Sequence, residues 1–141
     1  KVYNDQWMLE RGFLDVKTFK DLVGGRGAQP LINLKKEDTV AEAIELMKKY
    51  DIENIPVMDN GISVGAISAG GLFNKILSNP DIKSETIATV MEKAYPEVAF
   101  ETPVERLSSF ITKENGAVLS KDESGTFHIV TKYDIIQSLT K

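Results

Sequence analysis

Two stretches of the chain join a short apolar segment to a hydroxyl residue and then to a helical pattern. The later one, HIVTKYDII at 128–136, contains Thr131 and Asp134, and the earlier one is GAISAGGLF at 65–73. A hydroxyl followed three residues later by a carboxylate is the spacing of a helix-capping box, here with Asp in place of Glu. In the first turn of a helix Asp134 would also lie near the positive end of the dipole, which favours its ionised form. The pair can therefore cap a helix, bind a polar ligand, or do both.

No second group of residues has the spacing of a reactive centre. Cysteine is absent and His128 is the only histidine, which excludes disulfides, thiolate metal sites and histidine-rich metal sites. GGRG at 24–27 lacks the Gly-Lys-Ser/Thr ending of a phosphate-binding P-loop, so we interpret it as a loop. No nucleophile–base pair or pair of carboxylates stands out. We therefore expect a chain without catalytic activity of its own.

The composition is that of an ordinary globular protein. The chain has 141 residues, 42% of them hydrophobic and 27% charged, with a net charge of −4. Because the basic residues are scattered over an acidic chain, we expect no nucleic-acid partner. No apolar run approaches the roughly 18 residues of a membrane span, and no signal-peptide pattern opens the chain. With the absence of cysteine, this predicts a cytoplasmic protein without membrane contact. Residue 1 is not methionine, so we expect a piece of a longer chain.

The elements that must position this pair occur twice. In the first half, TVAEAIELMKKY at 39–50 predicts a helix with Thr39 as N-cap and Glu42 as its capping-box partner. IENIPVMD and SVGAIS predict two strands joined by a hairpin turn at Asn60-Gly61. AGGLFNKILS then predicts a helix that an Asn-Pro pair ends.

The second half follows the same order. ETPVERLSSFIT at 101–112 predicts a helix with Thr102 as N-cap and Pro103 at the first helical position. Its apolar face comprises Val104, Leu107, Phe110 and Ile111. GAVLS and TFHIVT predict strands joined by KDESG, and KYDIIQSLT predicts the last helix. Each half also begins with a helical lead-in, TFKDLV at 18–23 and TIATVM at 86–91, followed by a short strand, PLINL and PEVAF.

We therefore predict a mixed α/β (α+β) fold made of two β-α-β-β-α repeats. One such repeat, at roughly 55–60 residues, would be marginally stable alone. Two repeats packed sheet to sheet with pseudo-twofold symmetry would bury both sheets and leave clefts between the copies, where small ligands tend to bind. The predicted division is 1–26 as a linker and helical lead-in, 27–84 as the first repeat and 85–141 as the second.

The repeat TVAEAIELMKKYDIENIPVMDNGISVGAIS resembles a CBS domain, and residues 16–141 resemble a tandem CBS pair, or Bateman module. The helix pattern, the Ile55-Pro56-Val57 strand and the Thr131-x-x-Asp134 junction carry this resemblance. The opening KVYNDQWMLERGFL resembles the segment that follows the catalytic domain in cystathionine β-synthase-like enzymes. That shorter resemblance implies a catalytic domain in cis that holds pyridoxal phosphate, with no such cofactor in this chain. Other hosts of CBS pairs, such as nucleotide-metabolism enzymes and transporters, remain alternatives.

The resemblance to CBS pairs implies a ligand cleft between the copies. In that family a Thr-x-x-Asp junction holds a ribose, and apolar strand residues of the other copy flank an adenine. The residues at the matching positions are Thr131, Asp134, Val130 and Ile129 from the second copy, and Ile52, Asn54, Ile55 and Pro56 from the first. One carboxylate can accept hydrogen bonds from both ribose hydroxyls. Asn54 would contact the base edge, and Ile52 and Ile55 would cover its face, although both apolar side chains also suit a plain strand core.

Two departures from the family pattern affect the expected ligand. In the first copy Ser68 and Gly71 stand at the Thr and Asp positions, and Gly71 has no side chain to hold a diol. We therefore expect the sister site to be empty or weak. His128 stands where the family often has glycine, as Gly65 does in the first copy. It could obstruct the cleft, contact a phosphate or carboxylate of the ligand, or be an ordinary surface residue.

These features predict a non-catalytic regulatory module that senses an adenosyl compound such as AMP, ADP, ATP or S-adenosylmethionine. Through its CBS pair it would form a homodimer and control the attached enzyme. An alternative is a structural or oligomerisation module that binds no ligand, which Gly71 and His128 favour. A third hypothesis is an enzyme fragment with its own activity, and the missing catalytic residues count against it.

Overall fold

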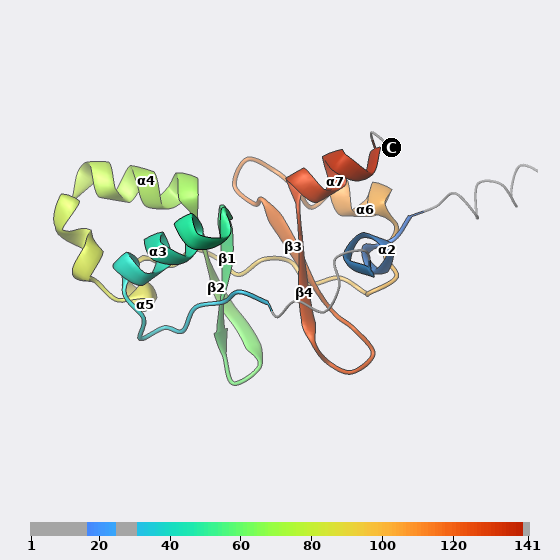
Figure 1. The fold of residues 1–141 in the computed structure, drawn as a ribbon, viewed down its shortest axis with the longest axis horizontal. Coiled ribbons are helices and arrows are strands. Elements are labelled where there is room, and N and C mark those ends of the chain that lie inside the picture. The colour runs from blue at the N-terminus through green and yellow to red at the C-terminus, as the bar shows by residue number, and fades with distance from the viewer. Residues whose placement is uncertain (1–16, 25–30, 140–141) are drawn as a thin grey trace, which may run out of the picture.

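The computed structural model describes residues 17–24 and 31–139, so the opening segment that resembles a post-catalytic linker lies outside the described residues. The elements form two halves that stand side by side (Figure 1). In chain order they are α2 (Phe19–Gly24), α3 (Val40–Tyr50), β1 (Asn54–Asp59), β2 (Ile62–Ser68), α4 (Ala69–Ser78), the 3-10 helix η1 (Pro80–Ser84), α5 (Ile87–Val90), α6 (Val104–Ser108), β3 (Ala117–Lys121), β4 (Phe127–Thr131) and α7 (Lys132–Leu139).

Both predicted hairpins and the predicted Thr39 cap are confirmed. β1 pairs antiparallel with β2, and β3 pairs antiparallel with β4. At the first turn Asn60 and Gly61 have φ values of 52° and 78°, as a two-residue type I′ hairpin requires. Thr39 caps α3 in a complete capping box with Glu42. The turn sets the pairing next to it, Asp59 with Ile62, and the register then shifts at a bulge between Val57 and Met58.

The short strands expected before each hairpin are reduced to single parallel bridges. Leu34 bridges to Val57 and Glu97 bridges to Leu119. In each case the next backbone hydrogen bond of the ladder would need an N–H from proline: Pro56 in the first half and Pro96 in the second. Since proline has no N–H, neither bridge extends into a regular ladder towards the N-terminal ends of its strands.

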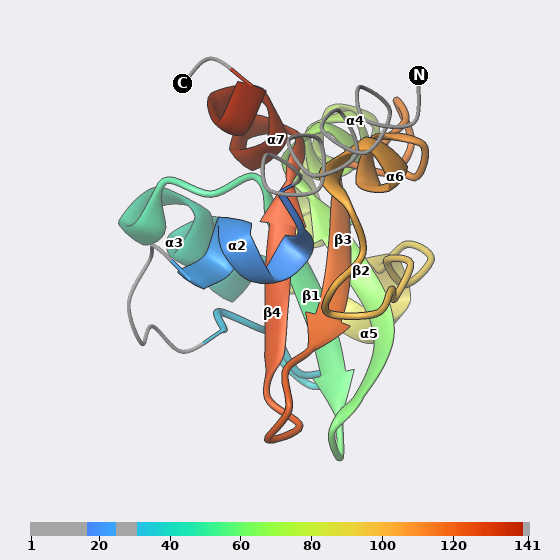
Figure 2. The same cartoon turned by 90° about the vertical axis from the view of Figure 1, so that its right-hand side faces the viewer.

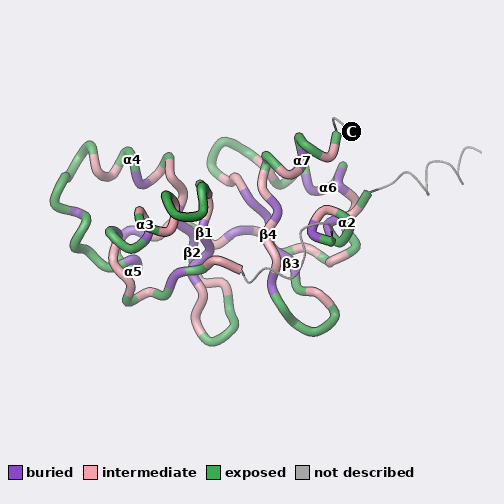
Figure 3. The backbone as a smooth tube through the Cα atoms, viewed as in Figure 1, coloured by how far each residue is buried: buried purple, intermediate pink, exposed green. Residues whose placement is uncertain are grey.

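The two sheets face each other at the centre of the molecule, as predicted. In Figure 1 the helices α3 and α4 lie on the outer side of one hairpin, and α2, α6 and α7 on the outer side of the other. Figure 2 shows the four strands running through the middle, between the helices. A cluster of buried side chains joins the facing sheets: Ala66, Tyr95, Ala117, Leu119 and Phe127. The buried backbone is concentrated in the strands (Figure 3).

The lead-in helices cross over between the halves. Phe19 and Val23 of α2 are buried in the core of the second half, beside Leu107 and Val130. In the corresponding way, α5 packs in the core of the first half, where Ile87 is fully buried. Each half is thus completed by the lead-in that precedes the other half in sequence. The division of the repeats at 84/85 remains a prediction, because α2 and α5 each pack in the half that they do not precede in sequence.

The predicted start of α6 is wrong by one position and its length is overestimated. Pro103, not Thr102, is the N-cap, and the helix ends at Ser108, so Phe110 lies beyond it with 39% of its surface exposed. The Thr102 hydroxyl donates to the carbonyl of Ala99 instead of capping the helix. Near the other end, the Ser108 hydroxyl bonds back to a helical carbonyl, a competition that disfavours continued helix.

Among the described residues, no helix is long and apolar enough to cross a membrane.

Candidate functional site

A cavity of about 1330 Å³ lies between the two halves, and the first turns of both α4 and α7 open onto it. Six of the nine side chains assigned to a ligand site from the sequence line this cavity. They are Thr131, Asp134, Ile129 and His128 from the second half, and Ile52 and Asn54 from the first. The fold therefore brings residues that are distant in sequence together around one cavity.

The other three assigned residues do not line the cavity. Val130 is fully buried in the core of the second half, and Ile55 is fully buried in the core of the first. Pro56 is also among the fully buried side chains. Side chains alternate between the two faces of a strand, so Val130 must point away from the cavity that Ile129 and Thr131 face. These three residues shape the strands behind the cavity wall.

Thr131 and Asp134 form the expected capping box at the start of α7. The Thr131 N–H and hydroxyl donate to Asp134 Oδ2 at 2.8 and 3.1 Å, and the Asp134 N–H donates to Thr131 Oγ1 at 3.4 Å. Thr18 and Asp21 make the same three hydrogen bonds at the start of α2, and neither lines the cavity. The spacing alone is thus a cap, and the position beside the cavity is what distinguishes Asp134.

The corresponding junction of the first half has a carboxylate after all, and it comes from another part of the chain. The Glu92 carboxylate accepts a hydrogen bond of 2.9 Å from the Ser68 hydroxyl, which caps α4 by accepting from the Gly71 N–H at 3.1 Å. A Cβ atom at position 71 would collide with this carboxylate. Lys75 lies 3.8 Å from Glu92 Oε2. Gly71 therefore leaves room for Glu92, which occupies the start of α4.

No sequence pattern predicts Glu92 at this position. It lies in the segment between the halves, which links α5 to α6 within the predicted second repeat, and it is held by two backbone hydrogen bonds with Ala66 at 2.7 and 3.0 Å. No spacing rule connects Glu92 to Ser68, since their contact depends on how that segment pairs with the edge of β2.

Asn54 lies between the two halves with partners on both sides. The Tyr95 hydroxyl donates to Asn54 Oδ1 at 3.0 Å, and a Cβ at Gly116 would lie 3.1 Å from the same oxygen. Burial raises the pKa of Tyr95, with a further contribution from the charge of Glu92, so the phenol stays protonated. Tyr95 was not singled out from the sequence, because its partner is distant along the chain.

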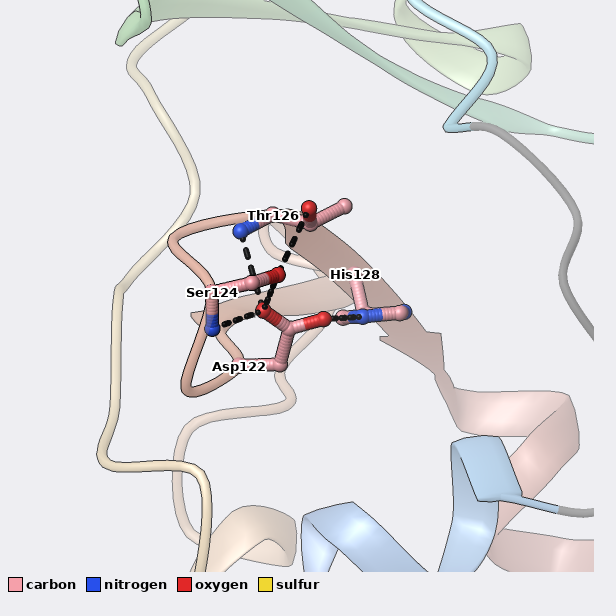
Figure 4. Close-up of polar contacts among 4 residues, drawn as sticks. All are labelled: Asp122, Ser124, Thr126 and His128. Carbon is pink, nitrogen blue, oxygen red and sulfur yellow. Dashed lines mark hydrogen bonds and ion pairs between the residues drawn. The ribbon is translucent and has the colours of Figure 1, made fainter.

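His128 is held by the turn between β3 and β4 (Figure 4). Its Nε2 lies 2.9 Å from Asp122 Oδ2, and because an ionised carboxylate can only accept, the ring nitrogen donates. The His128 ring also packs on Phe100, with 5.6 Å between ring centroids. His128 is among the residues that line the cavity, while its ring lies on the Val130 side of β4, packed on Phe100 with Nε2 engaged by the turn.

Asp122 organises that turn through several hydrogen bonds. Its Oδ1 accepts from the Ser124 N–H at 2.8 Å, the Ser124 hydroxyl at 2.7 Å and the Thr126 N–H at 3.0 Å. The bond from His128, followed by those from Ser124 and Thr126, holds the pKa of Asp122 well below its ordinary value. The cluster in Figure 4 is thus a turn with an ionised centre.

Acidic side chains outnumber basic ones around the cavity. The carboxylates on its lining are Asp51, Glu53, Glu92, Glu114 and Asp134, and the ammonium groups are Lys113 and Lys132. Such a surface repels a ligand with several negative charges. Within the described residues, no group of three or more His, Cys, Asp or Glu side chains is placed to hold a metal ion.

Comparison with known proteins identifies the fold. Residues 28–78 match the family model of the CBS domain. A cystathionine beta-synthase of Dictyostelium discoideum is 25% identical over the whole chain, which spans 32% of that relative's length. The solved CBS domain of NE2398 superposes with a TM-score of 0.79 at 18% identity, covering 89% of this chain and 99% of that one.

Two further solved structures contain ligands. The CBS domain pair of protein MJ0100, in complex with 5′-methylthioadenosine and S-adenosyl-L-methionine, has a TM-score of 0.72 at 23% identity and covers 89% of this chain and 97% of its own. CBSX2 in complex with AMP has a TM-score of 0.64 at 20% identity, with coverages of 87% and 96%. The chain has the fold of these CBS domain pairs.

Proposed function

We propose that this chain, a tandem CBS pair by its fold and its match at residues 28–78, is a non-catalytic regulatory module that binds an adenosyl ligand. The ligand would be AMP, ADP, ATP, S-adenosylmethionine or a related compound. Binding would change how the two halves pack, and an attached enzyme would respond. Such coupling requires that the ligand binds the two arrangements with different affinity.

One observation carries the proposal: the Thr131–Asp134 box opens onto the cavity between the halves. A carboxylate has about four acceptor positions, so capping the helix and binding the two hydroxyls of a ribose are compatible. Hydrogen bonds from ribose hydroxyls to a carboxylate would be charge-assisted and therefore stronger than bonds between neutral groups. Asp134 would thus be the ribose anchor.

The base would lie between the strands of the two halves. Ile52 and Ile129 line the same cavity as Asp134 and offer apolar surface for its faces, and Asn54 offers an amide for its edge. Val130, Ile55 and Pro56 would support this surface from behind. His128 would bound the cavity beside the turn and would not contact the ribose. The excess of carboxylates favours ligands with little negative charge, so S-adenosylmethionine and AMP suit the cavity better than ATP.

The partners follow from the relatives and the surface. The match to a cystathionine beta-synthase supports a pyridoxal phosphate-dependent enzyme of that kind as the attached catalytic domain, in a cytoplasmic protein. A homodimer is supported by apolar side chains that α4 and α7 leave exposed. These side chains are Phe73, Leu77, Ile136 and Leu139. The same exposed stripe favours the second candidate, an oligomerisation module that binds no ligand.

Thermal unfolding with added AMP, ATP, S-adenosylmethionine or adenosine separates the two candidates. A ligand specific for the folded state adds about 2.7 kcal/mol at 100 times its Kd. We expect stabilisation by at least one compound, and its loss in Asp134→Asn. Asp21→Asn is the matched control, since Asp21 makes the same capping bonds away from the cavity. If none of these compounds stabilises the chain, or if Asp134→Asn keeps the full shift, the proposed site is wrong.

A further inference from the structure

Tyr95 is a buried titratable residue that is linked to the proposed ligand cavity through one hydrogen bond. It lies in the segment between the halves, is only 6% exposed, and packs among Ala66, Ala117 and Phe127. Its hydroxyl reaches the amide of Asn54, which does line the cavity. The buried phenol therefore donates its hydrogen bond to a side chain of the cavity lining.

The hydrogen bond defines the orientation of the Asn54 amide. The Tyr95 hydroxyl lies 3.0 Å from Asn54 Oδ1 and 3.5 Å from the carbonyl oxygen of Ile67. A phenol has one proton to donate, and the nearer acceptor is Oδ1. Asn54 therefore turns its oxygen towards Tyr95, and its Nδ2 has no acceptor among the residues that the structure describes.

The second half restricts the same amide from the other side. A Cβ at Gly116 would lie 3.1 Å from Asn54 Oδ1 and 3.2 Å from Nδ2, so the amide packs directly on the Gly116 backbone. The Gly116 carbonyl in turn accepts a hydrogen bond of 3.3 Å from the Lys132 N–H, at the start of α7. Asn54 is thus held between Tyr95 and the backbone that leads to the Thr131–Asp134 junction.

We infer that Tyr95 is a positioning residue that makes Asn54 present an N–H donor, and not an oxygen acceptor, to the edge of the bound base. This inference rests on the proposed function, and it deepens it by giving the cleft a base preference. Adenine has an acceptor at N1, whereas hypoxanthine and guanine carry a proton there. A donor fixed in the protein pairs with the first and meets a second donor in the others.

Adenosine and inosine test this preference, because they share the ribose and differ at the base edge. Titration calorimetry with the full chain should give an adenosine-to-inosine affinity ratio on the order of tenfold, as one correctly paired base contact provides. In Tyr95→Phe the amide loses the bond that orients it, so the ratio should fall to within about threefold. Tyr50→Phe, at a 44% exposed tyrosine that does not line the cavity, should leave the ratio unchanged.

A second variant covers the case in which Tyr95→Phe destabilises the fold. Asn54→Asp keeps the oxygen that accepts from Tyr95 and replaces the NH2 donor by an acceptor. It should reverse the preference towards inosine, which loss of packing would not do. An unchanged ratio in a folded Tyr95→Phe or Asn54→Asp protein that still binds adenosine would overturn the inference alone. Failure of the unaltered chain to bind adenosine while it binds AMP or S-adenosylmethionine would overturn the inference alone, and failure to bind any of these compounds would overturn the proposed function as well.

Discussion

The two strand-to-helix junctions of this chain share a backbone and differ in where their carboxylate comes from. At the start of α7, the Thr131 hydroxyl donates to the carboxylate of Asp134, which lies three residues later in the first turn of the helix. At the start of α4, Ser68 donates to Glu92, which lies in the segment between the halves. Both carboxylates line the cavity, and the Lys75 ammonium group lies 3.8 Å from Glu92 Oε2.

This difference indicates that the hydroxyl of a repeated junction can receive its carboxylate partner from a distant part of the chain when the helix that follows has none at the matching position. The absence of a side chain at Gly71 creates the space, and Glu92 satisfies the Ser68 hydroxyl within the protein itself. A ligand at that end would have to displace Glu92 from Ser68. At the other end Asp134 and its hydroxyl partner belong to one junction beside the cavity, so we propose that the ribose binds there.

The largest loss of stability is expected from truncating a buried side chain of α2, the helix that crosses into the second half. Phe19→Ala deletes a fully buried ring of α2 from the core of the second half, which should cost about 3–5 kcal/mol of unfolding free energy. It should loosen the Asp134 junction more than the Ser68 junction. Urea unfolding measures the cost, with Ile62→Ala as the control at a 62% exposed position. A loss below about 1 kcal/mol would show that α2 does not complete that core.

Making the two junctions alike should create a second ligand site. The double variant Gly71→Asp/Glu92→Ala gives α4 the same hydroxyl and carboxylate spacing as α7. It also removes the side chain that competes for Ser68 and that would collide with a Cβ at position 71. Charge-assisted hydrogen bonds contribute about 1.5–3 kcal/mol each, enough for measurable binding. Titration with AMP should change from one to two molecules per chain. A stoichiometry that stays at one would mean that features other than the carboxylate separate the junctions.

Removing Glu92 alone should have a modest effect on stability and little on the Asp134 end. Glu92→Ala deletes one partly buried hydrogen bond to Ser68, worth about 0.5–1.5 kcal/mol. Thermal unfolding without ligand should detect the loss, while the affinity at the Asp134 end stays within about twofold. A tenfold fall in affinity would contradict the assignment of the ligand to the other junction.

The turn beneath His128 should add a pH dependence that the first half lacks. The pKa of Asp122 is lower in the folded protein than in the unfolded chain. The ionised carboxylate therefore stabilises the fold above about pH 4, and that stability is lost as the pH falls further. Unfolding measured between about pH 6 and pH 2 should show a smaller acid-induced loss in Asp122→Asn than in the unaltered chain. Equal losses would show that the turn does not hold the carboxylate in its ionised form.

Local patterns in the sequence predicted the parts of the fold that depend on near neighbours. Thr39 with Glu42 and the Asn60-Gly61 turn were identified from their spacing, and both have the predicted geometry. The Thr131–Asp134 cap follows the same rule. The identical bonds of Thr18 and Asp21 show the limit, since spacing predicts a cap and cannot tell which cap faces a cavity.

Features that depend on contacts distant in sequence could not be predicted. Glu92 reaches Ser68 only because the segment between the halves pairs with Ala66. Tyr95 reaches Asn54 for the same reason. The crossing of α2 into the second half also escaped prediction, because an apolar face indicates that a helix packs and does not indicate on which partner.

The asymmetry of the two junctions is tested most directly by deleting the equivalent hydroxyl at each. Thr131→Ala and Ser68→Ala each remove one helix-capping hydroxyl, so they carry a similar stability cost of about 0.5–2 kcal/mol. Calorimetric titration with AMP should show about tenfold weaker binding in Thr131→Ala, from one lost hydrogen bond, and a change below about twofold in Ser68→Ala. Equal weakening in both variants, or a greater loss in Ser68→Ala, would contradict the assignment of the ligand to the Asp134 end.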